Sequence, residues 1–285
     1  MKSVSARSVG GVILCALVFF FEAPQGWGSN SLYLQTNLVS DIPGIAQSTD
    51  PNLRNPWGVS FSTVSPFWVS NAASNTTTLY SGTGSTVVSL VAGIPGGPTG
   101  QVQNPTTGFL LSNGKPANFI FDVMAGSIYA WNTDSGPTAE QVATVPYMSF
   151  TGLALANNGS GYFLYAANSA GTVSIEVFDS TFTHTTLSGA FKDPSIPAGY
   201  VPYNVQAISG QLYVEYANFQ QNKGAVSIFD MNGTFIKELI AAGGPQLNLP
   251  WGVVIAPAGF GGFAANQQVG SEASEAGRGN HDAPG

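Results

Sequence analysis

The sequence has 285 residues, a length that suits one sizeable hydrophobic core better than two separate cores. Only 8 % of its residues are charged and its net charge is −7, with no cluster of Lys and Arg, which argues against a nucleic-acid-binding protein. Glycine and proline are frequent, at 35 and 18 residues, whereas Glu, Lys and Arg, which favour helices, are scarce. This composition predicts a chain of many short strands joined by tight turns.

The first 28 residues are typical of a secretory signal peptide. Lys2 and Arg7 precede an apolar run at residues 11–21 that is too short to cross a bilayer, and cleavage is expected after Gly28. The mature protein is therefore predicted to be exported, either secreted or held in the periplasm or on the cell surface. Cys15 is the single cysteine and lies in this segment, so the mature chain is expected to lack disulfides and thiolate metal sites. No later run is long and apolar enough to be a membrane span.

A pattern of four short strands recurs along the rest of the chain. The first copy begins at Trp57, later copies begin near Thr99, Gly152 and Asn204, and a fifth begins at Trp251, a period of about 40–55 residues. The strands mix β-branched and aromatic residues, and Gly, Asn, Asp, Ser or Pro bounds each of them. Four short strands at this period predict an all-β fold, a β-propeller in which each four-stranded sheet is one blade.

The phrase Pro-Trp-Gly-Val occurs twice, at residues 56–59 and 250–253, and is expected to begin the innermost strand of two blades. Proline is tolerated at the first residue of a strand, where its missing N–H does little harm. Gly58 and Gly252 are expected to let a neighbouring backbone approach closely. The rings of Trp57 and Trp251 are interpreted as packing between blades, with a ligand-stacking surface as the alternative.

The repeats resemble those of NHL-type propellers. The stretch "FLYAANSAGTVSIEVFDS" has an apolar strand ending in Asn, a small loop, and a next strand ending in Phe-Asp. More closely, residues 35–71 and 193–217 look like an uncharacterised family of exported bacterial propeller proteins. The resemblance covers roughly residues 32–263 and implies a propeller fold, while it implies no established chemistry.

Residues 29–263 are therefore assigned to the propeller, and residues 264–285 to a disordered tail outside it. From Ala264 onward, strand alternation stops and large apolar residues almost vanish, which is typical of disorder. Because the resemblance implies a longer chain, we expect a truncation or frameshift near Ala264. About five blades are then present, the last incomplete, of an intact form with six. The early strand at residues 31–39 is expected to supply an outer strand to the last blade, and residues 93–100 and 241–250 are expected to be loops at the rim.

One set of polar residues is expected to occupy one equivalent place, the end of the second strand of successive blades: Asn71, Asp122, Asn168 and Asn218. One hypothesis is a ring of oxygen ligands at a channel mouth that holds a cation, and such ligands suit Ca²⁺. The alternative is that each side chain hydrogen-bonds the backbone of its own turn. Repetition in every blade favours the alternative, because repeats share structural needs.

Other acidic residues have simpler interpretations. Asp179 and Asp230 follow third strands and are expected to start hairpin turns. Glu176 and Glu215 lie inside strands, where alternation predicts a solvated or inter-blade position. As a carboxylate pair for acid–base catalysis they remain a hypothesis, because the sequence does not fix their separation. His184 is expected in a turn, and the isolated histidines disfavour zinc or Ser-His-Asp chemistry.

The sequence is compatible with two functions. The first is an exported, non-enzymatic propeller that serves as a binding or scaffold module for an extracellular protein or carbohydrate. The second is a divalent-cation-dependent hydrolase or lactonase that uses Asn and Asp or Glu at the channel mouth. A Ca²⁺-dependent rise in melting temperature that Asn168→Ala or Asn218→Ala abolishes would favour the enzyme.

Overall fold

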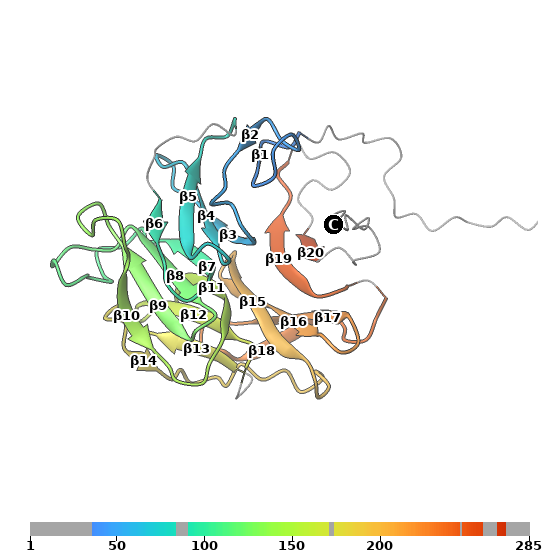
Figure 1. The fold of residues 1–285 in the computed structure, drawn as a ribbon. Coiled ribbons are helices and arrows are strands. Elements are labelled where there is room, and N and C mark those ends of the chain that lie inside the picture. The colour runs from blue at the N-terminus through green and yellow to red at the C-terminus, as the bar shows by residue number, and fades with distance from the viewer. Residues whose placement is uncertain (1–35, 84–90, 171–173, 246, 259–266, 272–285) are drawn as a thin grey trace, which may run out of the picture.

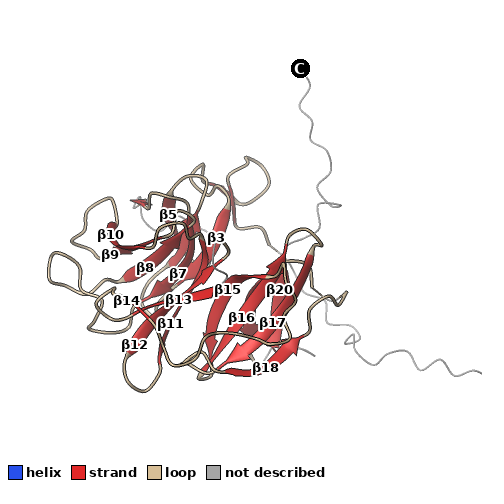
Figure 2. Cartoon of the chain, turned by 90° about the horizontal axis from the view of Figure 1, so that it is seen from below, coloured by secondary structure: helices blue, strands red, loops and turns tan. Residues whose placement is uncertain are grey.

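The computed structural model describes residues 36–83, 91–170, 174–245, 247–258 and 267–271, and in these ranges the chain forms strands and no helix (Figure 1, Figure 2). No candidate membrane-spanning helix is therefore found in the described ranges. The signal peptide predicted for residues 1–28 lies outside them. The all-β fold predicted from the composition is confirmed for the part of the chain that is described.

Four antiparallel sheets of four strands follow one another along the chain and form blades 1 to 4. Blades 1 and 2 comprise β3 (Pro56–Ser60), β4 (Phe67–Asn71), β5 (Thr76–Tyr80) and β6 (Ala92–Gly93), then β7 (Pro98–Gln103), β8 (Phe119–Val123), β9 (Ser127–Trp131) and β10 (Glu140–Thr144). Blades 3 and 4 comprise β11 (Phe150–Asn157), β12 (Tyr162–Asn168), β13 (Ser174–Phe178) and β14 (His184–Thr185), then β15 (Val201–Ile208), β16 (Gln211–Asn218), β17 (Lys223–Phe229) and β18 (Phe235–Ile240). Each sheet is a meander of sequential neighbours, the architecture of a β-propeller blade.

Blade 5 consists, in the described residues, of β19 (Pro250–Ile255) and β20 (Gln267–Ser271), which pair antiparallel. Strand β20 lies within residues 264–285, the segment that the sequence assigned to a disordered tail outside the propeller. Backbone groups alone make strand pairing, so a polar segment can pair with the edge of β19 without large apolar side chains. Strands β1 (Val39–Ser40) and β2 (Ser48–Thr49) form a separate parallel pair. The described end of the early strand thus pairs with β2, whereas the sequence predicted pairing with the last blade.

The first strands of the five blades lie around the middle of the molecule, in the order β3, β7, β11, β15 and β19 (Figure 1). As predicted, the two Pro-Trp-Gly segments begin two of these innermost strands, β3 and β19. The segments 93–100 and 241–250 are not loops throughout. Pro98 begins β7 and Pro250 begins β19, because proline is tolerated at the first residue of a strand.

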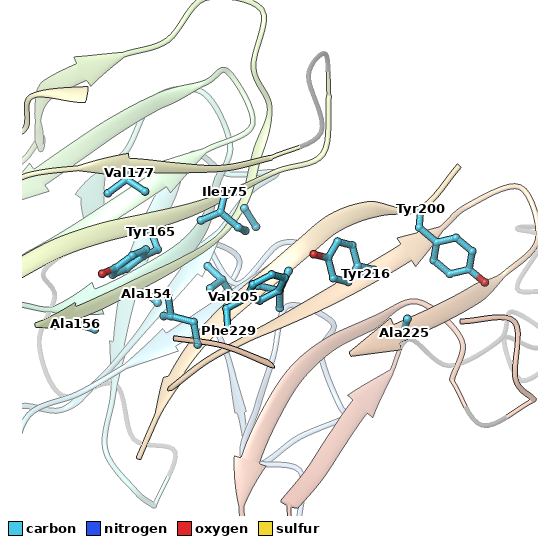
Figure 3. Packing of buried hydrophobic residues seen from close by; sticks show 13 residues of the cluster. Ala154, Ala156, Tyr165, Ile175, Val177, Tyr200, Val205, Tyr216, Ala225 and Phe229 are labelled. Atoms are coloured by element: carbon cyan, nitrogen blue, oxygen red, sulfur yellow. The ribbon is translucent and has the colours of Figure 1, made fainter. Parts of the chain in front are cut away.

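The blades pack face to face through layers of apolar side chains. Between blades 3 and 4, Tyr165, Ile175 and Val177 pack with Val205 and Phe229 (Figure 3). Similar layers join blade 2 to blade 3 and blade 1 to blade 2. Burial of one such large side chain stabilises a protein by about 1.5–3 kcal/mol, so these inter-blade layers form the core of the molecule.

A glycine in three first strands permits the close approach of the next blade. A Cβ atom at Gly58 would lie 2.5 Å from the carbonyl oxygen of Thr99 in blade 2. One at Gly100 would lie 2.7 Å from the carbonyl carbon of Gly152 in blade 3, and one at Gly152 would overlap Asn204 in blade 4. Real Cβ atoms essentially never come within 3.0 Å of a neighbour, so blades 1, 2 and 3 each require this glycine to accept the following blade, whereas blade 4 has Asn204 at the equivalent place.

The hairpins between third and fourth strands follow Asp179 and Asp230, as predicted. The Oδ1 atom of Asp179 accepts hydrogen bonds from the backbone N–H groups of Thr181 and Thr183, at 2.8 and 3.0 Å. Asp230 makes the equivalent pair of bonds in blade 4. These side chains fix the turn backbone by local hydrogen bonds.

Candidate functional site

One mouth of the propeller is formed where the first strands begin and the second strands end. First and second strands are antiparallel in every blade, so the start of one and the end of the other lie on the same face of the ring. Four aromatic residues gather at this mouth and are called the aromatic cluster. Trp57 is on β3, Tyr203 on β15 and Trp251 on β19, and Phe219 directly follows β16.

The rings of the aromatic cluster touch in a row from blade 4 to blades 1 and 5. The ring centroids of Phe219 and Tyr203 are 5.1 Å apart, those of Tyr203 and Trp57 are 5.7 Å apart, and those of Trp57 and Trp251 are 5.6 Å apart. All three contacts are edge-to-face, an arrangement that the aromatic quadrupole favours. Tyr203 is buried, the two tryptophans are half-buried, and 50 % of Phe219 is exposed. The cluster therefore combines a packed base with an apolar surface open to solvent.

Hydrogen bonds hold both indole rings in place. The Nε1–H group of Trp251 donates to the carbonyl oxygen of Thr151 at 2.7 Å, and that of Trp57 donates to Oδ1 of Asn55 at 3.2 Å. The side-chain amide of Asn204 donates to the carbonyl oxygen of Trp251 and links blade 4 to blade 5. Because these bonds orient the indole rings, little side-chain ordering is needed for a ligand to stack here.

Exposed amide side chains adjoin the aromatic surface. Gln220, Gln221 and Asn222 follow Phe219 in the turn after β16, and all three are exposed. Asn218 closes this turn, because its Oδ1 accepts a hydrogen bond from the backbone N–H of Gln221 at 3.1 Å. Side-chain amides both donate and accept hydrogen bonds, so the rim beside Phe219 can bind hydroxyl or amide groups without a formal charge.

The four residues predicted to form one polar ring do not occupy one equivalent place. Asn71 and Asn168 are equivalent, at the end of the second strands of blades 1 and 3. In blade 2 this place belongs to Val123, so Asp122 lies one residue earlier. In blade 4 a tyrosine takes it, and Asn218 lies two residues later. The unequal length of the second strands, five residues in blade 1 and eight in blade 4, accounts for the offset of Asn218.

Two amides of this set, those of Asn168 and Asn218, make contacts of the turn-forming kind. Oδ1 of Asn168 accepts from two backbone N–H groups at 3.1 Å, as Oδ1 of Asn218 does from one. Nδ2 of Asn71 donates to the hydroxyl of Thr78 at 2.9 Å, and its Oδ1 has no hydrogen-bond partner among the described residues. The described ranges hold no group of three or more His, Cys, Asp or Glu placed to bind a metal ion. The calcium site thus stays a prediction.

Two carboxyl groups occupy equivalent buried places that the sequence did not bring together, Asp122 in blade 2 and Glu215 in blade 4. Oδ1 of Asp122 accepts hydrogen bonds from the hydroxyl of Thr99 at 2.7 Å and from the backbone N–H of Gly100 at 2.5 Å. Burial outweighs these bonds and raises the pKa of Asp122 to about 7. Burial also raises the pKa of Glu215 well above its usual range, and neither of its oxygens has a partner among the described residues. Both are inner structural groups rather than exposed acids.

The hypothetical acid–base pair of Glu176 and Glu215 is divided between two environments. Oε2 of Glu176 lies 2.6 Å from Nε2 of His184 in blade 3, whereas Glu215 is fully buried in blade 4. The turn predicted around His184 is wrong, because His184 begins β14, the outermost strand of its blade. The neighbouring strand β13 places Glu176 beside it, a cross-strand contact that spacing in the sequence did not indicate.

Two proteins of Acanthamoeba polyphaga mimivirus, both described as uncharacterised, are similar to this chain. Protein R648 is 32 % identical over 247 residues, which cover 77 % of this chain and 60 % of R648. Protein L690 is 28 % identical over 248 residues, which cover 78 % of this chain and 64 % of L690. The chain thus spans less than two thirds of the length of these relatives, and no protein-family model matches it. These relatives are viral, so the bacterial origin expected from the resemblance stays a prediction.

Two solved structures are similar to the chain at low sequence identity. A chain of a nidogen/laminin complex has 16 % identity and a TM-score of 0.42, covering 65 % of this chain and 62 % of that chain. A catalytically inactive virginiamycin B lyase from Staphylococcus aureus, solved with quinupristin, has 17 % identity and a TM-score of 0.48, covering 72 % and 62 %. The propeller assignment stands on the order of strands within the blades.

Proposed function

We propose that this chain is an exported, non-enzymatic binding module and that the aromatic cluster is its ligand-binding surface. One observation carries the proposal: rings from three blades meet at one mouth, and Phe219 at the end of the row is half exposed. An exposed apolar surface rimmed by polar groups is typical of a binding site. Export rests on the predicted signal peptide at residues 1–28.

The chemistry around the aromatic cluster favours a neutral carbohydrate as the ligand. A sugar ring offers an apolar C–H face that can stack on an aromatic ring, and hydroxyl groups that can bond to side-chain amides. Phe219 supplies the first kind of contact, and the adjacent Gln220, Gln221 and Asn222 supply the second. With charged residues at 8 %, the chain has few groups for ionic recognition.

A titration followed by tryptophan fluorescence tests this proposal, because Trp57 and Trp251 lie in the proposed site. The chain is titrated with neutral oligosaccharides of glucose, xylose and mannose. Phe219→Ala is expected to raise the Kd of a bound oligosaccharide about tenfold, which corresponds to about 1.4 kcal/mol. Because half of Phe219 is exposed, this change is expected to leave folding intact.

Tyr162→Ala is the matched control. Tyr162 is 40 % exposed and begins β12, so it lies at the opposite mouth of the ring. Its removal is expected to leave the Kd unchanged. Unchanged affinity in Phe219→Ala would contradict the assignment of the site. If none of the oligosaccharides bound, the carbohydrate class would be wrong and a protein ligand would take its place.

A further inference from the structure

Blade 5 keeps a first-strand glycine although no blade approaches it among the described residues. Gly252 is the equivalent of Gly58, Gly100 and Gly152, each of which is crowded by the following blade. A Cβ atom at Gly252 would meet no atom within 4 Å. Val254, which lies two residues further along β19 on the same face, is 60 % exposed. The side of blade 5 that faces away from blade 4 is therefore open.

Blade 1 is open on the side that faces away from blade 2. The residue after the first-strand glycine, or after Asn204 in blade 4, is buried by the preceding blade in blades 2 to 5. Its exposure there is 6, 6, 1 and 2 % for Gln101, Leu153, Val205 and Val253. Its equivalent in blade 1, Val59, is 56 % exposed. The difference shows that blade 1 lacks a preceding neighbour in the described structure.

The second strand of blade 1 repeats this difference. Phe67 is 37 % exposed, whereas its equivalents in the next three blades, Phe119, Leu164 and Leu212, are buried. Phe67, Val69 and Tyr80 line a cavity of 760 Å³ between blade 1 and the segment that contains β1 and β2. This segment covers part of the face of blade 1 and leaves Phe67 and Val59 open.

The contact between Trp57 and Trp251 does not close the ring. These two rings join blades 1 and 5 at the mouth, yet Val59 and Gly252, the next residues inward, remain uncovered. The open space between blade 5 and blade 1 is called the gap, and it is lined by Gly252, Val254, Val59 and Phe67.

We propose that the gap is the place of one further blade of the same repeat, supplied by a longer form of this polypeptide. Such a blade continues an interface that the molecule already repeats between blades 1 and 2 and between blades 2 and 3. There a glycine meets the backbone of the next blade, and the residue after the next glycine is buried. Both mimivirus relatives are longer than the matched region, which covers 60 and 64 % of them. This inference concerns a surface distinct from the exposed face of the aromatic cluster and does not depend on the proposed function.

The chemistry of the gap defines what this blade must present. Its first strand must run along Gly252, where the absence of a side chain leaves room for a close approach. Its opposite face must be apolar, because Val59 and Phe67 offer no hydrogen-bonding side chain. Leaving such apolar faces and the neighbouring strand edge open favours aggregation, and one blade would cover them together.

Cysteine labelling of the 285-residue chain tests whether the gap is open. In a Cys15→Ser background, Val59→Cys and Gly252→Cys are expected to react with a maleimide at least about tenfold faster than the control Leu153→Cys, whose position lies within a filled blade interface. Equal protection of all three in a monomer would overturn the proposal. Protection that disappears on dilution would assign the gap to a second copy of the chain and would overturn it too.

A fusion protein tests the occupant. The probe is a copy of blade 4, residues 201–240, joined after Gly285. The fused blade is expected to slow labelling of Val59→Cys and Gly252→Cys about tenfold and to leave Ser160→Cys, in the exposed β11–β12 turn, unchanged. Labelling of both gap cysteines at the rate of the unfused chain, while Leu153→Cys stays protected, would contradict a blade as the occupant.

Discussion

Alanine at two equivalent glycines, Gly100 and Gly252, should have opposite effects on stability. At Gly100 the new methyl group would lie 2.7 Å from the carbonyl carbon of Gly152 and 2.8 Å from Cβ of Leu153. The backbone nitrogen of Leu153 would lie closer still. Ordinary van der Waals contact begins at 3.4 Å, so blades 2 and 3 would have to separate by more than about 0.7 Å. At Gly252 the methyl group would enter open space.

The size of each effect follows from these surroundings. Overpacking of this kind costs about 1–3 kcal/mol, and a protein of this size loses roughly 2–4 °C of melting temperature per kcal/mol. Gly100→Ala is therefore expected to melt about 2–12 °C lower. Gly252→Ala is expected to melt at the same temperature or up to a few degrees higher, because alanine restricts the unfolded chain by about 0.4–1 kcal/mol.

Thermal unfolding followed by circular dichroism, with urea unfolding as a second measurement, checks both variants. Neither glycine has a positive φ angle, so alanine introduces no backbone strain at either place and the comparison is matched. An equal loss of stability in Gly100→Ala and Gly252→Ala would refute the glycine-to-next-blade rule and the open gap together.

Three further predictions concern the buried carboxyls, the metal hypothesis and a turn. Because burial raises the pKa of Asp122 from 3.8 to about 7, the folded state holds a proton that the unfolded state releases, so stability should fall as the pH rises from about 4 to about 7, by up to roughly 4 kcal/mol. Asp122→Asn keeps the acceptor atom and should lose this share of the pH dependence in urea unfolding; an unchanged profile would show that Asp122 is ionised when buried. Addition of calcium at about 1 mM should change the melting temperature by less than about 1 °C relative to the protein without calcium. The reason is that the amide oxygens of Asn168 and Asn218 already accept hydrogen bonds from backbone N–H groups. A clear rise that Asn71→Ala abolishes would instead support the cation-dependent hydrolase or lactonase. Asp179→Ala should destabilise the protein by about 1 kcal/mol through loss of its two backbone bonds, whereas Asp179→Asn should lose less, and the reverse order would exclude a turn-forming role.

The sequence predicted the blades because their pattern is local. The strand residues, the turn residues and the repeat all fall within about 45 residues. The four meanders and the two strands that begin with Pro-Trp-Gly could therefore be predicted from the sequence. The hairpins after Asp179 and Asp230 followed for the same reason, since an Asp side chain bonds its own turn.

The candidate site depends on the register of strand pairing and on contacts between distant blades. The amino-acid sequence does not give either of these directly. Trp57 and Trp251 were recognised as a repeated pair, but their contact with Tyr203 and Phe219 crosses the ring. A bulge in each first strand shifts the pairing by one residue. Asp122 lies one residue before the place that Asn71 and Asn168 occupy, although the second strands of blades 1 and 2 both have five residues.

The sequence did not indicate strand β20, for a different physical reason. The polar composition of residues 264–285 indicated disorder, yet pairing with β19 uses backbone groups that every residue has. Composition indicates whether a segment can build a core and says little about whether it can pair with an exposed strand edge.

The decisive measurement is the NMR spectrum of the indole N–H groups during titration with a bound oligosaccharide. Trp57 and Trp251 hold their N–H groups in known hydrogen bonds at the aromatic cluster, while Trp68 and Trp131 are buried between blades 1 and 2 and serve as internal controls. We predict that the resonances of Trp57 and Trp251 shift with saturation and that those of Trp68 and Trp131 stay in place. Binding that shifts only Trp68 and Trp131, or none of the four, would contradict recognition at the aromatic cluster.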